Sequence, residues 1–447
     1  MIQRFRKEFF MDSLKSMKKF SDSKPLIKIG IVSDSQCYDV RADWGMSNLI
    51  KALKLLAPRQ PEVMIMPGDL ADLGDFPGAF TLYKELCREY FPGQEPVQIA
   101  CAGNHDLWPA DKSISREALF KRFCEKMELP PDNPCRTVVK GYDFITVTEN
   151  INCNYTPELI DALALELKAA AERDPGKPIF VVSHFPPQDT VSGSWNDAGK
   201  EALRELFSKY PQVISLSGHT HYPLEDERCI WQGGFTAITT STLSYGCISE
   251  NLFNVCNGIV PFAREVVQAL YMEVFADHVE IHRYNVEDFC EIKPDKVWSF
   301  ALPYDPGDPE YSPEKRAVKR SAPVFPAGSS LVLRYDYGFV YAIFDAAEHD
   351  DLVQYYRIEA ARKDANGVYQ TVKSVDYVSD FYRLKSNRAK RMFFKLPADM
   401  LAPGELHKIS VYAIESFGKI SAPLTIERVV PFSWRFREID PKAMPQE

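Results

Sequence analysis

The amino-acid sequence predicts a layered α/β domain followed by a smaller all-β domain. Three observations lead to this fold class. Over the first half of the chain, short apolar runs alternate with segments of helical periodicity, which is typical of α/β layered folds. Five of the apolar runs end in clusters that contain Asp, Asn or His. After a proline-rich stretch near residue 300, the chain changes to short runs in which apolar and polar residues alternate, as in a β-sandwich.

The composition is that of a globular protein with more than one domain. At 447 residues the chain is long for a single core. Its 45% apolar and 26% charged residues are ordinary values. The net charge of −9 argues against a nucleic-acid backbone as the standing partner. The ten cysteines are scattered singly, with no CxxC pair, so we expect free thiols.

The amino-terminal region predicts neither export nor membrane insertion. Residues 1–25 form a polar, lysine-rich leader whose basic start never continues into the apolar segment of a signal peptide. No run approaches the roughly 18 apolar residues that a membrane span requires. We therefore expect a cytoplasmic protein without a membrane partner, and the sequence leaves the oligomeric state open.

The α/β domain is expected to span residues 26–290. Its predicted strands are 27–33, 62–66, 97–101, 137–139, 142–147, 178–183 and 213–216, with short pieces at 229–231, 235–238, 270–275 and 278–284. Its predicted helices, which have apolar residues at helical spacing, are 43–56, 77–90, 115–127, 156–173 and 197–209. Ser115 and Thr156 are typical first-turn capping residues.

The rest of the chain divides into a linker, a second domain and a tail. Residues 291–325 are rich in proline and charge, as in an inter-domain connector. Residues 326–430 have predicted strands at 330–335, 340–344, 355–360, 391–396 and 408–414. Their length and their last hairpin resemble a fibronectin type III-like module, a fold that hosts many roles. Residues 431–447 are a predicted C-terminal tail.

Polar side chains follow five predicted strands at the points where the strands end. In chain order they are Asp34 and Gln36, then Asp69, then Asn104, His105 and Asp106, then His184, and finally His219 and His221. Loops at the carboxyl ends of strands build the sites of such sheets, so we expect these residues to converge. Two imidazoles separated by one residue, His219 and His221, suit a transition metal. Gly218 before them allows a sharp turn. The Gly218–His221 motif alone is equally consistent with an ordinary loop.

The motifs together are more specific than any one of them. In order and spacing, Asp34-x-Gln36, Gly68-Asp69, Gly103-Asn104-His105-Asp106, His184 and Gly218-His219-Thr220-His221 resemble the calcineurin-like metallophosphoesterase superfamily over residues 26–285. The resemblance implies a four-layer α/β/β/α sandwich and two divalent metal ions, Mn²⁺, Fe or Zn²⁺. It implies one ion on Asp34, Gln36, Asp69 and His221, and another on Asp69, Asn104, His184 and His219. The implied reaction is hydrolysis of a phosphate mono- or diester by a metal-activated water.

Three residues of these motifs need separate interpretations. His105 is not a ligand in this scheme and would act as the general acid on the leaving oxygen. Asp106, or another acceptor, would fix the tautomer of His105, and the other interpretation of Asp106 is a loop cap. Gln36 departs from the family pattern, which has a histidine there. An amide oxygen is a weaker and harder ligand than imidazole, so we expect a shift toward Mn²⁺, Mg²⁺ or Fe.

Substrate contacts and competing functions are less specific. Tyr38, Arg41 and Trp108 follow the first and third motifs and are candidate substrate contacts, although aromatic packing under loops is an equal interpretation for Tyr38 and Trp108. Residues 239–262 are a candidate lid. The expected partner is a small-molecule or protein phosphate ester. A nuclease is disfavoured by the acidic charge. The alternative is a catalytically weak, metal-bound binding or adhesion protein that uses the β-domain.

Overall fold

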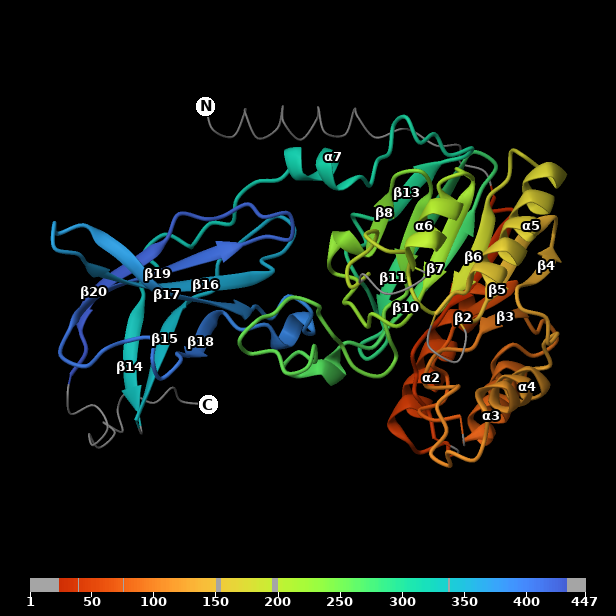
Figure 1. Ribbon diagram of the computed structural model, residues 1–447, viewed down its shortest axis with the longest axis horizontal. Coiled ribbons are helices and arrows are strands. Elements are labelled where there is room, and N and C mark those ends of the chain that lie inside the picture. The colour runs from red at the N-terminus through yellow and green to blue at the C-terminus, as the bar shows by residue number, and fades with distance from the viewer. Residues whose placement is uncertain are drawn as a thin grey trace.

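The protein forms an α/β domain and a β-sandwich that lie side by side (Figure 1). The computed structural model describes residues 24–38, 40–74, 76–149, 154–194, 200–336 and 338–431. Most of the expected leader, nearly all of the expected tail and the start of the helix expected at 197 lie outside these residues. Within these ranges, the helices are too short or too polar to cross a membrane.

Two sheets form the centre of the α/β domain. The strands of the first are β1 (Ile27–Ile31), β2 (Val63–Pro67), β3 (Val97–Cys101), β10 (Gln268–Val274), β11 (His278–Asn285), β12 (Cys290–Glu291) and β13 (Trp298–Ala301). Those of the second are β4 (Cys135–Val139), β5 (Tyr142–Val147), β6 (Ile179–Ser183), β7 (Val213–Ser217), β8 (Ile230–Gln232) and β9 (Thr236–Thr239). The orders are β12-β11-β10-β1-β2-β3, with β13 on β11, and β4-β5-β6-β7-β9-β8.

The inner strands of both sheets are parallel. Strand β2 pairs in parallel with β1 and β3. In the second sheet, β5, β6, β7 and β9 pair in parallel in that order. Strand β10 runs antiparallel to β1 and continues the first sheet toward β11. Each sheet therefore presents the carboxyl ends of its parallel strands along one edge.

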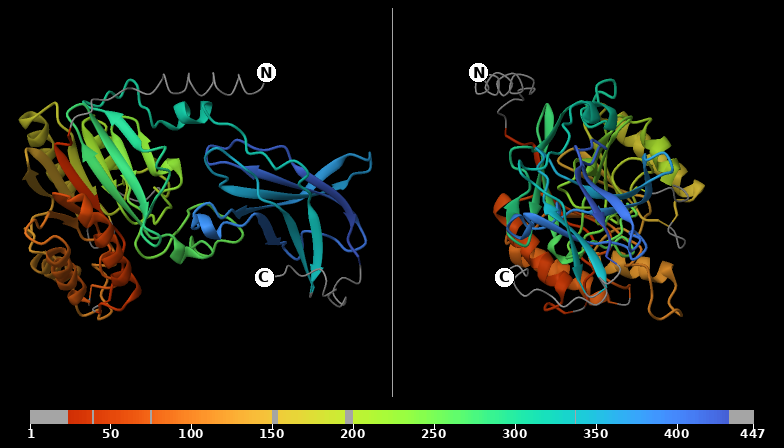
Figure 2. Two further views of the ribbon diagram at one scale, coloured as in Figure 1. Left: turned by 180° about the vertical axis from the view of Figure 1, so that it is seen from behind. Right: turned by 90° about the vertical axis from the view of Figure 1, so that its left-hand side faces the viewer.

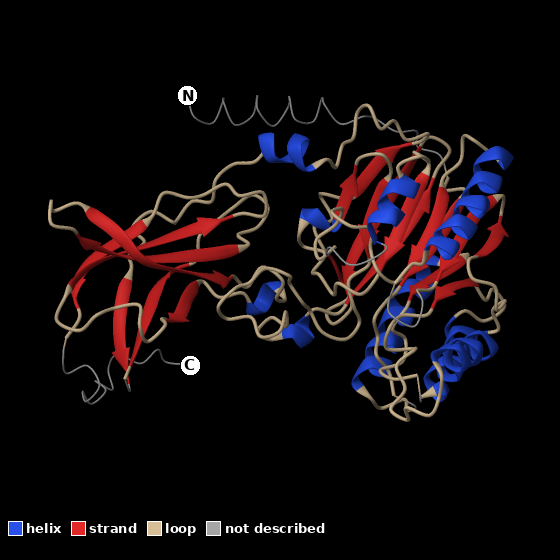
Figure 3. Cartoon of the chain, viewed as in Figure 1, coloured by secondary structure: helices blue, strands red, loops and turns tan. Residues whose placement is uncertain are grey.

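Helices cover the outer face of each sheet (Figure 3). They are α2 (Trp44–Leu56), α3 (Pro77–Tyr90), α4 (Arg116–Met127), α5 (Pro157–Arg173) and α6 (Lys200–Phe207). The side chains of Asp43, Ser115 and Thr156 accept first-turn amide hydrogens of α2, α4 and α5. These caps satisfy backbone donors that a helix start leaves free.

Three apolar clusters hold the layers of this domain together. Ile29 and Ile65 face the core between the two sheets, and Met64 on the same strand as Ile65 faces α2 and α3. In the second sheet, Phe180 faces the inter-sheet core and Val181 faces α5 and α6. Alternate side chains of a strand point to opposite faces, so these continuous apolar runs are covered on both sides. The four-layer α/β/β/α arrangement expected from the resemblance is confirmed.

The second domain is a sandwich of two antiparallel sheets, seen from two further directions in Figure 2. One contains β14 (Val332–Asp336), β15 (Phe339–Asp345) and β18 (Arg391–Lys395) in that order. The other has the order β17-β16-β19-β20, with bounds Tyr369–Val378, Tyr355–Lys363, Leu406–Ile414 and Leu424–Val429. The sequence did not predict β17 and β20. Both are edge strands. Only Tyr377 and Val378 are buried in β17 and no residue is buried in β20, so their apolar pattern is weak.

The expected linker is shorter than residues 291–325. Strands β12 and β13 pair with β11, and Trp298 of β13 is fully buried. The first domain therefore continues to about residue 301. The short helix α7 (Pro313–Val318) lies in the remaining connector. Pro294 and Pro303 flank β13 without interrupting its ladder, which is why a proline-rich stretch still contains a strand.

Replacing Phe180 by Ala tests the inter-sheet core. The ring is fully buried and stacks on Phe144 at a centroid distance of 4.8 Å. We expect the free energy of unfolding to fall by about 3–5 kcal/mol, because lost transfer energy and a cavity add together. Urea unfolding measures this change. Phe289→Ala, at a ring that is 49% exposed, is the matched control, and equal losses in both variants would contradict the layer assignment.

Candidate metal centre

The strand-end loops bring all the predicted ligands into one region. The loops after β1 and β2 are joined by backbone hydrogen bonds, from Asp34 N to Gly68 O at 3.2 Å and from Gln36 N to Asp69 O at 2.9 Å. The loops after β3, β6 and β7 reach the same place from both sheets. Five predicted ligands have left-handed backbones with φ between 47° and 66°, namely Asp34, Gln36, Asp69, His219 and His221. Such strained residues collect at functional sites.

Two motif glycines leave room for ligand carboxylates. A Cβ atom on Gly103 would lie 2.2 Å from Asp69 Oδ1, and one on Gly218 would lie 2.3 Å from Asp34 Oδ2. Neither distance is compatible with a side chain. The positive φ of the last motif falls on His219 and His221, not on Gly218. Gly218 therefore allows Asp34 to approach closely, whereas the left-handed conformations of the turn fall on His219 and His221.

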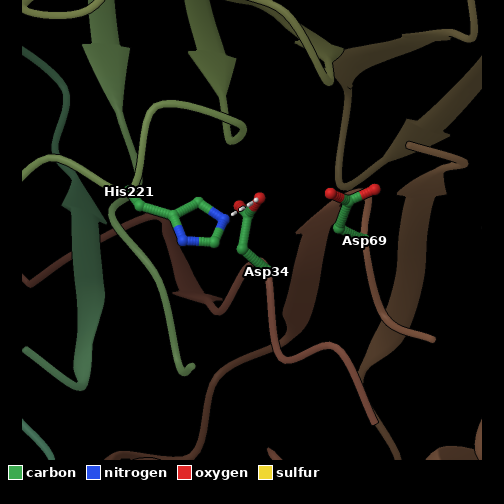
Figure 4. A group of neighbouring side chains, drawn as sticks. All are labelled: Asp34, Asp69 and His221. Atoms are coloured by element: carbon green, nitrogen blue, oxygen red, sulfur yellow. Dashed lines mark hydrogen bonds and ion pairs between the residues drawn. The ribbon is translucent and has the colours of Figure 1, made fainter. Parts of the chain in front are cut away.

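Asp34, Asp69 and His221 form a buried group with ligand atoms within 4.8 Å of one another (Figure 4). His221 Nε2 lies 3.1 Å from Asp34 Oδ1. The other contacts of Asp34 are the amide of His219, at 3.0 Å from Oδ1, and the hydroxyl of Ser33, which donates to Oδ2. The amide of His219 and the hydroxyl of Ser33 thus hold the carboxylate so that it faces His221 and Asp69.

Asn104, His184 and His219 form a second group around the same Asp69. His184 Nε2 lies 3.0 Å from Asn104 Oδ1 and 3.3 Å from Asp69 Oδ2. His219 Nδ1 lies 3.2 Å from the same Asn104 oxygen. Asp69 belongs to both groups, which is the position that the sequence resemblance gives to a bridging ligand.

The two buried imidazoles of the site, His184 and His221, are oriented for a cation. The Nδ1 atom of His184 lies 2.8 Å from the carbonyl oxygen of Pro67, and that of His221 lies 2.8 Å from the carbonyl oxygen of Tyr245. A carbonyl only accepts, so each Nδ1 carries a hydrogen and Nε2 is the nitrogen directed at the carboxylate and amide oxygens. This arrangement is the usual support of a metal-ligating histidine. The carboxylate, amide and imidazole donors suit Mn²⁺, Fe or Zn²⁺, so the residues present fit the implied ions.

The electrostatics of the groups agree with that fit. Burial opposes ionisation of Asp69, but the neighbouring His184 outweighs it and holds the pKa of this carboxyl well below its usual range. Burial, with His184 nearby, lowers the pKa of His219 far below the usual value. A metal requires ionised carboxylates and neutral imidazoles. Asp69 and His219 therefore favour the protonation states of ligands. Against the effect of burial, Asp69 raises the pKa of His184 well above its usual value, so a metal bound there would displace a proton from His184.

Gln36 lies beside the first group and is almost fully buried. Its amide oxygen accepts a hydrogen bond from Ser244 Oγ at 2.9 Å. This contact restrains the orientation of the amide. The side chain that departs from the family pattern is thus held by a residue 208 positions away in the chain.

His105 is held at one nitrogen and available at the other. Its Nδ1 lies 2.8 Å from the carbonyl oxygen of Asp72, and its amide donates to Asp69 Oδ1 at 2.8 Å. The acceptor that fixes the tautomer is therefore Asp72. The carboxylate of Asp106 accepts instead from the amides of Ala71 and Gly103, at 2.8 and 2.9 Å. These contacts favour the loop-cap interpretation of Asp106.

The three candidate substrate contacts have different surroundings. Trp108 is 42% exposed, and its ring centroid lies 4.7 Å from that of His105. The Tyr38 hydroxyl hydrogen-bonds with Asp72, which raises the pKa of Tyr38, and the residue is 45% exposed. Arg41 forms an exposed ion pair with Glu89 of α3 at 3.1 Å. The structure thus brings Trp108 and Tyr38 beside His105 and its supporting loop, whereas Arg41 is paired with a helix.

Several residues that support the site gave no signal in the sequence. Ser33, Asp72, Ser244 and Tyr245 hold Asp34, His105, Gln36 and His221, respectively. Asp72 and Tyr245 act through main-chain carbonyls, which any residue has. Residues 241–243, in the segment expected to be a lid, are fully buried. This part of the segment lies under the ligand loops and does not cover the site from outside.

A metal centre on the loops of an α/β/β/α sandwich defines a metallophosphoesterase-type domain. Residues 27–223 match the family model of the calcineurin-like phosphoesterases. These residues therefore form a domain of that family. No curated protein matches the sequence.

Similar solved structures include two phosphatases. A dimetal phosphatase from Danio rerio is 11% identical, with a TM-score of 0.43, and the match covers 63% of this chain and 100% of that one. The purple acid phosphatase PPD1 from yellow lupin (Lupinus luteus) seeds is 12% identical, with a TM-score of 0.46. That match covers 63% of this chain and 55% of the lupin chain.

Gly103→Ala tests whether the site requires close approach to Asp69. The added Cβ would lie 2.2 Å from Asp69 Oδ1 and 2.8 Å from His184 Nδ1, so both ligands have to move. We expect the bound Mn²⁺ per chain, measured by elemental analysis after dialysis, to fall below that of the unchanged protein. In the control Gly176→Ala, the new Cβ would lie 3.7 Å from Asp174 Oδ1, an ordinary contact, and metal content should stay constant. Equal metal content in both variants would refute the constraint.

Proposed function

We propose that the protein hydrolyses a phosphate mono- or diester with two divalent metal ions. Asp34, Gln36, Asp69 and His221 would hold one ion. Asp69, Asn104, His184 and His219 would hold the other. The observation that carries this proposal is the position of Asp69, which lies in the buried group with Asp34 and His221 and also 3.3 Å from His184 Nε2. A single carboxylate shared by two ligand groups is what a dinuclear site needs.

The chemistry divides between the ions and His105. When bound, such ions supply Lewis acidity toward the phosphate and a water of lowered pKa. His105 Nδ1–H donates to the Asp72 carbonyl, so its Nε2 is free to carry the second proton of the imidazolium. We propose that Nε2–H gives this proton to the leaving oxygen as general acid. Asp106 holds the loop that presents His105, through its contacts with Ala71 and Gly103.

The substrate side of the site is aromatic. Trp108 beside His105 and Tyr38 on the neighbouring loop are both about half exposed. Aromatic rings of this kind stack on a base, a sugar or a phenyl group. We propose a small-molecule or protein phosphate ester as substrate, a cytoplasmic location, and no nucleic-acid or membrane partner. The net charge of −9 supports this choice.

The proposed ligands support a choice of metals. Imidazole and carboxylate together favour Mn²⁺, Fe or Zn²⁺. Gln36 replaces an imidazole by an amide oxygen in the first group, which favours Mn²⁺ or Fe there over Zn²⁺. A generic phosphate ester assayed with each metal in turn tests the proposal. Protein that holds metal but turns over no ester with any of them would sink it.

The second candidate function is a metal-bound binding or adhesion protein with weak catalysis. The β-sandwich favours it, because its three- and four-stranded sheets in the order β14-β15-β18 and β17-β16-β19-β20 support a fibronectin type III-like module. Gln36 also favours it, since it weakens one ligand set. The oriented His105 favours the enzyme instead.

His105→Ala separates the enzyme from the binding protein. We expect kcat to fall by about 10²–10⁴-fold, because a positioned general acid contributes that much. Metal content should stay at that of the unchanged protein, since His105 is outside both ligand groups. Steady-state kinetics with a poor leaving group and elemental analysis give the two readings. Unchanged turnover in the variant would assign the activity to a contaminant or to other groups.

Metal removal tests the link between the site and stability. Dialysis against a chelator should abolish turnover and lower Tm, because ions that bind only the folded state stabilise it. That stabilisation is about 4 kcal/mol at a thousandfold excess over Kd. Adding Mn²⁺ back should restore both. A Tm that is indifferent to chelation and to Mn²⁺ would speak against bound ions at this buried site.

A further inference from the structure

One segment of the α/β domain contacts both the metal centre and the β-sandwich. It comprises residues 240–265, which we name the bridging segment, and it appears in green between the two domains in Figure 1. It follows β9 and precedes β10, so it leaves the second sheet and enters the first. Its contacts at the two ends are of different kinds.

The near end of the bridging segment holds the first ligand group. Thr242 Oγ1 donates to the carbonyl oxygen of Asp34 at 3.0 Å, and Ser244 Oγ donates to Gln36 Oε1 at 2.9 Å. His221 Nδ1 lies 2.8 Å from the carbonyl oxygen of Tyr245, whose ring centroid lies 4.6 Å from the imidazole. Three of the four proposed ligands of the first ion are therefore supported by three residues within positions 242–245.

The far end of the bridging segment is attached to the β-sandwich. The amide of Phe253 donates to the carbonyl oxygen of Asp376 at 2.8 Å. Asn254 makes two hydrogen bonds with the backbone of Val378, at 2.8 and 3.2 Å. Further along, the Tyr382 hydroxyl donates to Pro261 O at 2.8 Å, and Arg383 pairs with Glu265 at 2.7 Å.

A buried polar network connects the two ends. The residue after His221 is Tyr222, which is fully buried and whose hydroxyl donates to Glu250 at 2.9 Å. Gln354 of the β-sandwich, only 2% exposed, donates through Nε2 to the Tyr222 hydroxyl at 3.1 Å and to Glu250 Oε1 at 2.7 Å. Arg228 donates to the same two groups at 2.7 and 2.9 Å. Removing one member of such a network leaves the others buried without full partners.

The second ligand group is supported differently. The hydrogen bonds and ion pairs of Asn104 and His184 run to Pro67, Asp69 and His219, all within the α/β domain. The β-sandwich is therefore connected to the first ligand group, through the bridging segment and His221. Among the residues that the structure describes, the contacts that support Asn104 and His184 in the second group do not involve the sandwich.

We infer that Gln354 is a positioning residue for the first metal site, so that the β-sandwich is a working part of the metal centre. The inference rests on the proposed function, because it assumes that Asp34, Gln36, Asp69 and His221 hold an ion. Under this inference the β-sandwich supports the metal site of the α/β domain, and this role does not require the sandwich to bind another molecule. Loss of the Gln354 contacts loosens Tyr222 and Glu250, and through them the backbone that carries His221 and its Tyr245 acceptor.

The test compares full-length variants by Mn²⁺ binding in equilibrium dialysis at 25 °C. Gln354→Met keeps the length of the side chain and removes both donors, and Tyr222→Phe removes the hydroxyl from the other side. We expect the unchanged protein to bind two ions, and each variant to bind one of them about 10–100-fold more weakly, as losses of outer partners do. The double variant should lose little more than either single one, because both act on one network.

Tyr356→Phe is the matched control. Its hydroxyl is buried within the β-sandwich and accepts the amide hydrogen of Ala347 at 3.0 Å. This variant should lower Tm and leave both Mn²⁺ affinities unchanged. Tyr222→Phe removes a single oxygen atom inside the α/β domain. Its Mn²⁺ affinities therefore test the inference if Gln354→Met does not fold.

Two results would overturn the inference while the proposed function stands. One is a Gln354→Met or Tyr222→Phe protein that binds both ions as the unchanged protein does, with only Tm lowered. The other is an equal loss at both ions, which would mean a general loosening. An unchanged protein that binds fewer than two ions would contradict the dinuclear proposal itself, whatever the variants do.

Discussion

The buried carboxylate of Asp69 accepts the amide hydrogen of His105 and lies 3.3 Å from His184 Nε2, while the same residue groups with Asp34 and His221. A charge in this position is unfavourable without compensation, because burial penalises the ionised form. The surrounding fold supplies that compensation. Two sheets place their parallel strand ends at one region, and Gly103 leaves the space that the carboxylate occupies. The ligand geometry, the tautomers and the proposed dinuclear chemistry all depend on this arrangement.

The molecule supports its metal centre with main-chain carbonyls as much as with side chains. Pro67, Asp72 and Tyr245 each accept from the Nδ1 atom of a functional histidine through a backbone oxygen. Backbone positions are set by the fold, so the orientation of each imidazole follows from the packing of its loop. This explains why contacts at the distant β-sandwich are relevant to His221. These contacts hold the backbone of the bridging segment, and that backbone includes the Tyr245 carbonyl that accepts from His221.

The convergence of the proposed ligands was predictable from sequence, because each belongs to a local pattern in which an apolar strand ends in a polar residue. The four layers followed from the resemblance that these motifs carry. The supports were not predictable, since Ser244 and Gln36 lie 208 positions apart, and a carbonyl acceptor leaves no trace in residue type. Asp106 was expected beside His105 because the two are neighbours in the chain, but its carboxylate turns to Ala71 and Gly103. Strands β17 and β20 were missed because exposed edges lack apolar alternation.

The left-handed backbones at Asp34, Gln36, Asp69, His219 and His221 set function against stability. Each such residue costs of order 1–3 kcal/mol, although Asp and His tolerate this conformation better than Gln. Glycine would relax any of these positions while removing a ligand. Selection for thermal robustness alone would therefore erode the centre one residue at a time. The same pressure would act at the other left-handed residues of the chain, such as Gln60 and Glu128, where glycine removes no proposed ligand.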